Sequence, residues 1–229
     1  MPTPKLGYRD KKGRKCPGVT TVIGQNLGWG QDALMGWAQW CGEKGFSWIQ
    51  QRNYAGTIGT AAHDRIEAEL KGVELGRREL PPDVRNKAEA CFKGWVKWRG
   101  MQPLNFRVLE LELHLVSEKY GFGGTVDAIL GMDGQTVLTD WKTSSALRPS
   151  HLIQISAYWK LVEEMRPDLA LSPQALLVNV NKSGQLKTHL VKEPELKAGF
   201  DAFHHLLELH RLRETLDHGF ELVEEEVDL

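Results

Sequence analysis

The chain has 229 residues, a formal net charge of −1, 41% hydrophobic residues and 26% charged residues, which is the composition of an ordinary globular protein with a substantial core. A membrane protein is excluded, because no apolar run approaches the roughly 20 residues needed to cross a bilayer. The three cysteines (Cys16, Cys41 and Cys91) form no CxxC pair, so we expect a reduced, cytoplasmic protein with no membrane partner.

The first hundred residues predict a short β-hairpin followed by three helices. The hairpin covers residues 8–23, and Gly28–Gln31 predict a turn after which Asp32 caps the first helix. The second helix follows the glycine-containing segment Gly56–Gly59 and runs to Leu70. The third begins at Pro81-Pro82 and ends at Gly100, because proline suits the first turn of a helix and glycine its end.

Tryptophan is frequent, with eight residues in the chain. Trp37 and Trp40, like Trp95 and Trp98, fall at helical spacing, which predicts that these indoles lie in the core. An exposed indole could instead stack on a base.

The remainder of the chain predicts an α/β arrangement. Three strands come first, then a helix, two shorter strands and a final helix. The predicted ranges are strands over 106–116, 121–130 and 135–141, a helix over 150–165, strands over 175–180 and 186–191, and a helix from 193 to about 219. Residues 221–228 form an acidic tail that is either an edge strand or frayed. We therefore predict a central mixed sheet flanked by helices with an N-terminal helical addition, divided into regions 1–100 and 101–229 of one compact domain.

Two aspartates on the predicted strands are the strongest functional signal. The turn between these strands contains Asp133-Gly134, a strong hairpin signal, and the hairpin would bring Asp127 beside Asp140. Because side chains alternate along a strand, Asp140 and Lys142 point to the same face. Two carboxylates can hold Mg²⁺, and the backbone carbonyl of Trp141 could complete the protein's share of the ligands.

An isolated Asp-x-Lys tripeptide is weak evidence, since a surface ion pair is by far the commoner explanation of it. Because the tripeptide shares a hairpin with Gly124-Thr125-Val126-Asp127, it instead indicates a site that hydrolyses phosphodiesters. A cation there would polarise a phosphoryl oxygen and activate a water, while Lys142 would orient that water or offset the developing charge.

Four further residues are candidates for this site. His63 shares a helix face with Glu67 and could ligate a metal, although a lone helical histidine is more often structural. Glu112 lies on the preceding strand and could face the metal or solvent. Gln154 and Tyr158, at i and i+4 on a helix, could support Lys142 or a phosphate, or belong to the edge of the core.

Taken together, these residues resemble the RecB-like branch of the PD-(D/E)XK nucleases. The matching pieces occur in the family's order over roughly residues 17–160: the segment Gly59–His63 with Glu67, then Glu112, Gly124–Asp127, Asp140–Thr143 and Gln154–Tyr158. The segment from Pro17 to Ile23, with the helix that follows it, is similar to phage-encoded members and to the mitochondrial genome maintenance exonuclease.

The resemblance implies a restriction-endonuclease-like fold in which His63, Asp127 and Asp140 bind Mg²⁺ or Mn²⁺ and Lys142 is catalytic. It implies that Glu112 assists and that Gln154 and Tyr158 support the site and contact DNA. An iron–sulfur cluster is not expected, because no cysteine lies beyond Cys91 to match the family's C-terminal set. No phosphate-loop motif occurs either, so we expect a stand-alone nuclease or the nuclease subunit of a larger assembly.

The sequence therefore predicts a metal-dependent deoxyribonuclease, an exonuclease acting on single strands or DNA ends in phage or bacterial recombination and repair. A recombination protein or a single-strand-binding protein is a possible partner. Two other interpretations stay open: a non-catalytic module that binds DNA ends, and an interaction protein whose carboxylates form surface ion pairs. Polarity, strand preference, DNA versus RNA, the number of metal ions and the oligomeric state are not determined by these residues.

Overall fold

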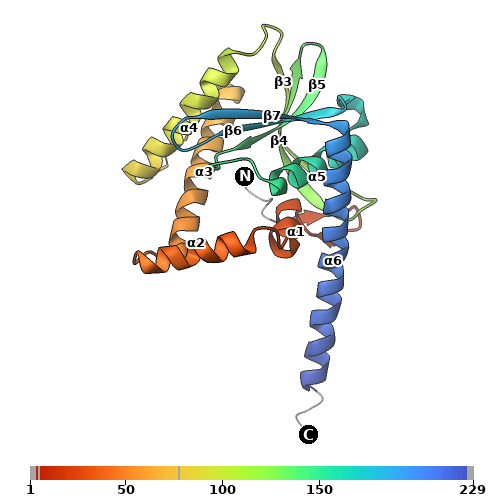
Figure 1. The fold of residues 1–229 in the computed structure, drawn as a ribbon. Helices are drawn as coiled ribbons and strands as arrows, with labels where there is room; N and C mark the ends of the chain where they lie inside the picture. The colour runs from red at the N-terminus through yellow and green to blue at the C-terminus, as the bar shows by residue number, and fades with distance from the viewer. Residues whose placement is uncertain (1–3, 5, 77, 226–229) are drawn as a thin grey trace.

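The computed structural model describes residue 4, residues 6–76 and residues 78–225. Five strands form one mixed sheet in the order β3-β4-β5-β6-β7 (Figure 1). Neighbouring strands are antiparallel except β5 and β6, which run parallel and are joined by the crossover helix α5. The strands are Arg107–Val116 (β3), Gly123–Met132 (β4), Gln135–Lys142 (β5), Gln174–Val180 (β6) and Leu186–Lys192 (β7).

Helices flank this sheet and also form an N-terminal region, as predicted. They are Val19–Asn26 (α1), Gln31–Glu43 (α2), Trp48–Lys71 (α3), Pro82–Gly100 (α4), Pro149–Met165 (α5) and Glu193–Glu225 (α6), with a 3₁₀ turn, η1, at Pro167–Leu169. The predicted α/β class with a central mixed sheet is confirmed. None of the described helices combines the length and apolarity needed to cross a membrane.

Two hydrophobic clusters hold the helices to the sheet. In the first, α1, α5 and α6 pack on the sheet through residues such as Val22, Ile155 and Phe203. In the second, Ile66 of α3 and two tryptophans of α4 pack around Trp141 of β5. The Trp98 and Trp141 rings lie 5.4 Å apart in an edge-on arrangement, a geometry that adds about 0.5–1.5 kcal/mol beyond burial. This second cluster fixes α3 and α4 beside the end of β5.

The N-terminal region differs from the prediction in the hairpin, in the second helix and at the start of the first helix, and the hairpin differs most. Only Tyr8–Arg9 (β1) and Lys15–Cys16 (β2) form the hairpin, and the β-branched segment from Val19 is helical. Val19, Val22 and Ile23 recur at helical spacing and are buried against α5 and α6, so tertiary packing overrides their strand propensity.

The second helix was predicted too short. Helix α3 begins at Trp48, capped by Ser47, so Gly56–Gly59 lies inside the helix and does not lead into it. A Cβ at Gly59 would lie 3.1 Å from the Thr143 hydroxyl. The absence of a side chain there lets α3 approach the end of β5, which compensates for glycine's cost of about 1 kcal/mol in a helix.

Helix α2 begins at Gln31 after Gly30, whose φ is +83°, so Asp32 lies in the first turn and is not the cap. The prediction that its tryptophans are core residues is wrong: Trp40 is 50% exposed and Trp37 only partly buried, whereas Trp95 and Trp98 are buried as expected. All three cysteines are buried.

Helix α6 is longer than predicted. It runs through Gly219 to Glu225, so the acidic tail is helical up to this point and is not an edge strand; residues 226–228 lie outside the described part of the chain. The far half of α6 extends away from the sheet (Figure 1).

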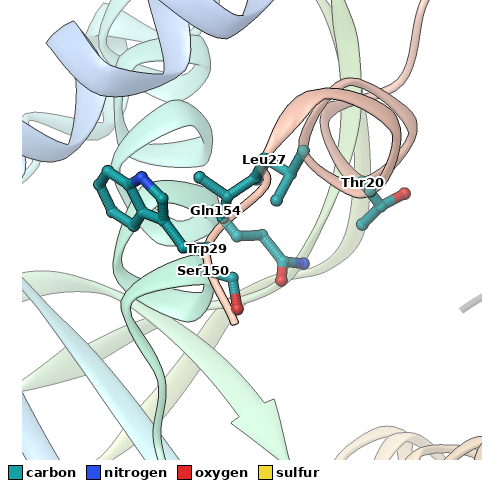
Figure 2. A pocket seen from close by; sticks show the side chains of 7 residues that line it. Thr20, Leu27, Trp29, Ser150 and Gln154 are labelled. Carbon is teal, nitrogen blue, oxygen red and sulfur yellow. The ribbon is translucent and has the colours of Figure 1, made fainter. Parts of the chain in front are cut away.

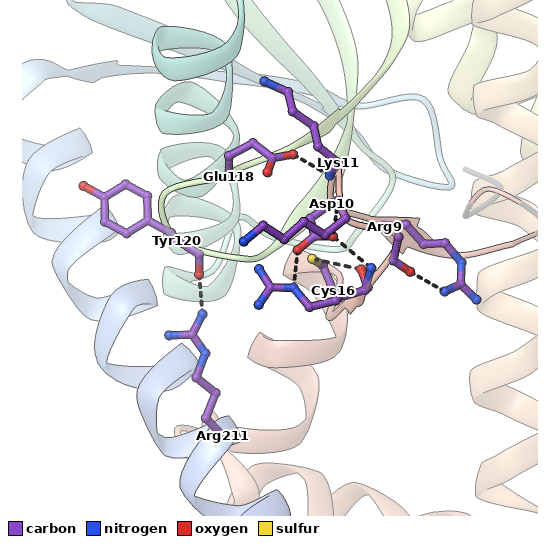
Figure 3. A network of polar contacts seen from close by, with 10 residues as sticks. Arg9, Asp10, Lys11, Cys16, Glu118, Tyr120 and Arg211 are labelled. Atoms are coloured by element: carbon purple, nitrogen blue, oxygen red, sulfur yellow. Dashed lines mark hydrogen bonds and ion pairs between the residues drawn. The ribbon is translucent and has the colours of Figure 1, made fainter.

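The β1–β2 hairpin is tied to the rest of the chain by polar contacts (Figure 3). Asp10 accepts hydrogen bonds from the backbone N–H groups of Lys12 and Arg14. The Lys11 N–H donates to Glu118 at 2.9 Å, next to Tyr120, whose carbonyl accepts from Arg211 of α6. These contacts fix the N-terminal segment against the turn before β4.

Candidate active site

The β4–β5 hairpin brings the two aspartates together as predicted. Its two turn residues, Asp133 and Gly134, have φ values of +49° and +76°, the arrangement that joins twisted antiparallel strands. Ala128 pairs with Thr139, which places the adjoining Asp127 and Asp140 side by side, and the Trp141 N–H donates to Asp127 Oδ2 at 2.8 Å. The hairpin therefore holds both carboxylates at its open end.

Both aspartates are buried, Asp127 at 1% and Asp140 at 0% exposure. Burial and the neighbouring Asp140 raise the pKa of Asp127 well above its usual range. Burial also raises the pKa of Asp140, although Lys142 opposes that shift. Lys142 Nζ lies 2.5 Å from Asp140 Oδ2. The lysine thus supplies the positive charge nearest to the pair.

His63 reaches the same place from helix α3. Its Nδ1 lies 3.9 Å from Asp127 Oδ1. Burial, reinforced by the positive charge of Lys142, lowers the pKa of His63 to about 3. The imidazole is therefore neutral at physiological pH and keeps a lone pair that can bind a metal.

Glu112 adds a third acid. The β3–β4 pairs on either side of it, Leu111 with Ala128 and Leu113 with Val126, place Glu112 opposite Asp127. Its φ is +49°, a left-handed conformation that is rare for a side chain other than glycine and is often found at functional sites. Burial and the nearby Glu67 raise the pKa of Glu112 to about 7.

The other acid and the histidine of β3 are engaged elsewhere, because Glu110 pairs with Arg166 and His114 Nδ1 lies 2.6 Å from the Thr125 hydroxyl. Of these three polar side chains of β3, Glu112 is therefore the one that lies at the site.

Helix α5 closes the other side of the site through Tyr158. Gln154 Nε2 donates to the Tyr158 hydroxyl at 3.0 Å. Burial and the Asp140 carboxylate raise the pKa of this phenol well above its usual range. A Cβ on Gly124 would lie 2.7 Å from the Tyr158 ring, so only glycine lets the tyrosine pack here. This close approach explains the glycine of the Gly124–Asp127 segment.

Several buried polar atoms at the site have no hydrogen-bond partner. They are His63 Nδ1, Glu112 Oε2, Asp127 Oδ1 and Asp140 Oδ1, whereas Asp140 Oδ2 is paired with Lys142. Unpaired buried groups are costly, and ions satisfy them. Among the described residues no group of three His, Cys, Asp or Glu is assembled as a ready metal cage. Mg²⁺ needs only one or two carboxylates and keeps its waters, so the donor set fits such an ion.

A pocket of about 340 Å³ opens beside these residues. His63, Lys142 and the segment from Thr143 to Ser144 line it, together with Lys182 from the β6–β7 turn. Lys182 was not predicted as a site residue, because the sequence Asn181–Gly184 indicates only a turn and not what the turn faces.

A family model for the PD-(D/E)XK nuclease superfamily matches residues 50–226, more than half of the chain. The chain belongs to the PD-(D/E)XK nuclease superfamily. It is accordingly a nuclease, with the sheet and helices of that superfamily. No curated protein matches the chain.

Solved structures give weaker matches. The alkaline exonuclease LHK-Exo from Laribacter hongkongensis shares 15% identity at a TM-score of 0.34, covering 68% of this chain and 84% of the exonuclease. Its complex with dAMP shares 13% identity at a TM-score of 0.34, covering 71% and 97%. The crystal structure of SSO0001 shares 18% identity at a TM-score of 0.31, covering 68% and 72%. These likenesses are too low to add to the family match.

Proposed function

We propose that this nuclease hydrolyses DNA phosphodiesters with the help of Mg²⁺ or Mn²⁺ held by Asp127 and Asp140. The observation that carries this proposal is the buried pair of aspartates, in which Asp127 Oδ1 and Asp140 Oδ1 have no hydrogen-bond partner. The repulsion between the two carboxylates, which contributes to the raised pKa of Asp127, would be relieved by a cation. His63 would be a neutral ligand and the Trp141 carbonyl a further one. When bound, such an ion polarises a phosphoryl oxygen and lowers the pKa of its water.

The chain's own residues supply the remaining functions in this proposal. Lys142 places its ammonium where negative charge develops on the reacting phosphate. Glu112, with a pKa of about 7, can accept a proton from the attacking water near neutral pH. Tyr158, which accepts a hydrogen bond from Gln154 and packs against Gly124 of β4, keeps Asp140 in position. A divalent ion, and no iron–sulfur cluster, is the cofactor.

We further propose that the enzyme is an exonuclease acting on single strands or ends. The pocket of about 340 Å³ is lined by His63 and Lys142, the neighbours of the two aspartates, and by the loop after β5. An unpaired strand enters such a pocket more easily than an intact duplex does. A cytoplasmic role in phage or bacterial recombination and repair, beside a recombination or single-strand-binding protein, is consistent with this activity.

End-labelled single-stranded, duplex and circular DNA, each with Mg²⁺, Mn²⁺ or chelator, test the proposal. Asp140→Asn and Lys142→Ala should lower the metal-dependent rate by about 100- to 1,000-fold with an unchanged circular dichroism spectrum. The matched controls are the exposed Asp201→Asn and Lys187→Ala, which should cleave at the wild-type rate. Wild-type rates in the site variants would refute the assignment. Binding of DNA in chelator without cleavage in Mn²⁺ would indicate a non-catalytic module.

A further inference from the structure

A larger groove continues from the catalytic pocket. It has a volume of about 930 Å³ and lies between the α1–α2 linker, α2 and α3 on one side and the β5–α5 loop on the other. Ala55 of α3 lines both the pocket and the groove, so the two are adjacent. The groove meets a third hollow of about 290 Å³, with which it shares Leu27, Trp29 and Ser150.

Figure 2 shows this far hollow between α1 and α5. Trp29, from the linker after α1, stands at one side of it and Thr20 of α1 at the other, with Gln154 of α5 between them. Gln154 donates to Tyr158, the tyrosine beside Asp140. The groove therefore begins at the catalytic pocket and ends at the helix that supports the aspartates.

The charges that line the groove are all positive. Arg52 of α3 and Arg148 before α5 line it, and no Asp or Glu is among its lining residues. Although the catalytic residues are acidic and the chain has a net charge of −1, this groove suits a polyanion.

Large indoles also line the groove. Trp29 is 66% exposed and Trp37 is partly buried. Both present apolar ring surface to a groove with cationic walls. Proteins hold unpaired bases by placing aromatic rings beside basic side chains that bind the DNA backbone, because stacking requires a base face that a duplex keeps covered.

We propose that this groove binds the single-stranded DNA that adjoins the scissile phosphate, with bases stacked on Trp29 and Trp37 and the backbone held by Arg52 and Arg148. This inference rests on the proposed nuclease function and gives that function its substrate class. An unpaired strand gains the stacking contacts, whereas a blunt duplex gains only the contacts to the arginines.

The test measures binding of a fluorescein-labelled oligothymidine to the full chain in chelator by anisotropy. Trp29→Ala should weaken binding by about 5- to 150-fold, which corresponds to ~1–3 kcal/mol for one stacked base. The matched control is Trp40→Ala, an exposed indole of α2 that lines none of these hollows, and it should bind as the wild type does. Arg52→Ala should weaken binding to all sequences and reduce the salt slope by about 1.

Blunt duplex of the same length is the second arm. Wild-type protein should prefer the single strand, and Trp29→Ala should reduce that preference. Trp29 is exposed, so its replacement should leave the fold intact; Trp37→Ala, checked by circular dichroism, gives a second reading. Unchanged single-strand binding in both variants, or equal losses for strand and duplex, would overturn the proposal.

The two proposals fail separately. If Trp29→Ala binds normally while Lys142→Ala loses cleavage, the groove assignment is wrong and the nuclease function stands. If Trp29→Ala loses binding but no metal supports cleavage by the wild type, the groove stands and the catalytic proposal fails.

Discussion

The replacement Glu112→Gln tests whether the third acid of the site is held in an unfavourable environment. The pKa of Glu112 is about 7 in the folded protein against 4.5 in the unfolded chain. Since one pKa unit corresponds to 1.36 kcal/mol, the full shift is a ceiling of about 3 kcal/mol. This side chain is partly exposed, and solvent screening reduces the penalty to ~1–2 kcal/mol.

The pH dependence gives the sign. Below pH 4.5 the carboxyl is protonated in both states and no penalty exists. As the pH rises from 4.5 through 7, the folded state holds a proton that the unfolded state has lost, so the free energy of unfolding falls, and above pH 7 the penalty is complete. Glutamine does not titrate, so in chelator at pH 8.5 Glu112→Gln should melt ~2–6 °C above the wild type.

Thermal unfolding followed by circular dichroism between pH 4.5 and 9 measures this gap. Glu110→Gln, the same change two residues away on β3, is the matched control; it loses the ion pair with Arg166, 2.8 Å in the wild type, and should gain no stability at high pH. The reasoning is refuted if the gap between Glu112→Gln and the wild type is the same at pH 4.5 and pH 8.5, or if the wild type is the more stable protein at pH 8.5.

Three other predictions concern packing and the metal. Gly94→Ala should lower the free energy of unfolding by ~1–3 kcal/mol, because its Cβ would lie 2.3 Å from Val180. Gly36→Ala in α2 has open space around its Cβ and should raise the free energy of unfolding by ~0.5–1 kcal/mol. Urea titration measures both variants, and equal effects would contradict the packing argument. Mn²⁺ should raise the melting temperature of the wild type but not of Asp127→Asn, and an equal rise in both would place the ion elsewhere. Tyr158→Phe should keep the fold yet lower the cleavage rate, since it removes the hydroxyl that accepts from Gln154, and an unchanged rate would show that this hydrogen bond is dispensable.

The hairpin of the site could be predicted because its signals are local. The turn at Asp133-Gly134 and the alternation along β5 together set the register that brings Asp127 beside Asp140. The neighbouring Lys142 follows from the same register. These features depend on residues close in the chain, so a single sequence carries them.

Features set by distant parts of the chain could not be predicted in this way. The segment from Val19 was predicted as a strand because β-branched residues suit strands, and only its burial against α5 and α6 makes it helical. The left-handed φ of Glu112 has no sequence signal, since neither glycine nor asparagine marks the position. Trp29 and Trp40 are the same residue type, and only the packing of the helices decides that Trp29 lines the groove whereas Trp40 does not.

The docking of Ile66 among the tryptophans of α4 and β5 also bears on how the protein moves. His63 is carried by a helix whose buried contacts with the sheet run largely through that cluster, whereas Asp127 and Asp140 belong to the sheet itself. Structures of this kind open in separate cooperative units. An excursion of α3 and α4 would carry the histidine away while leaving the aspartate pair intact, so amide hydrogen exchange should be faster in α3 than in β4 and β5. The fraction of molecules with a complete site, in which His63 lies beside the aspartate pair, would then equal the fraction in which α3 and α4 are docked on the sheet.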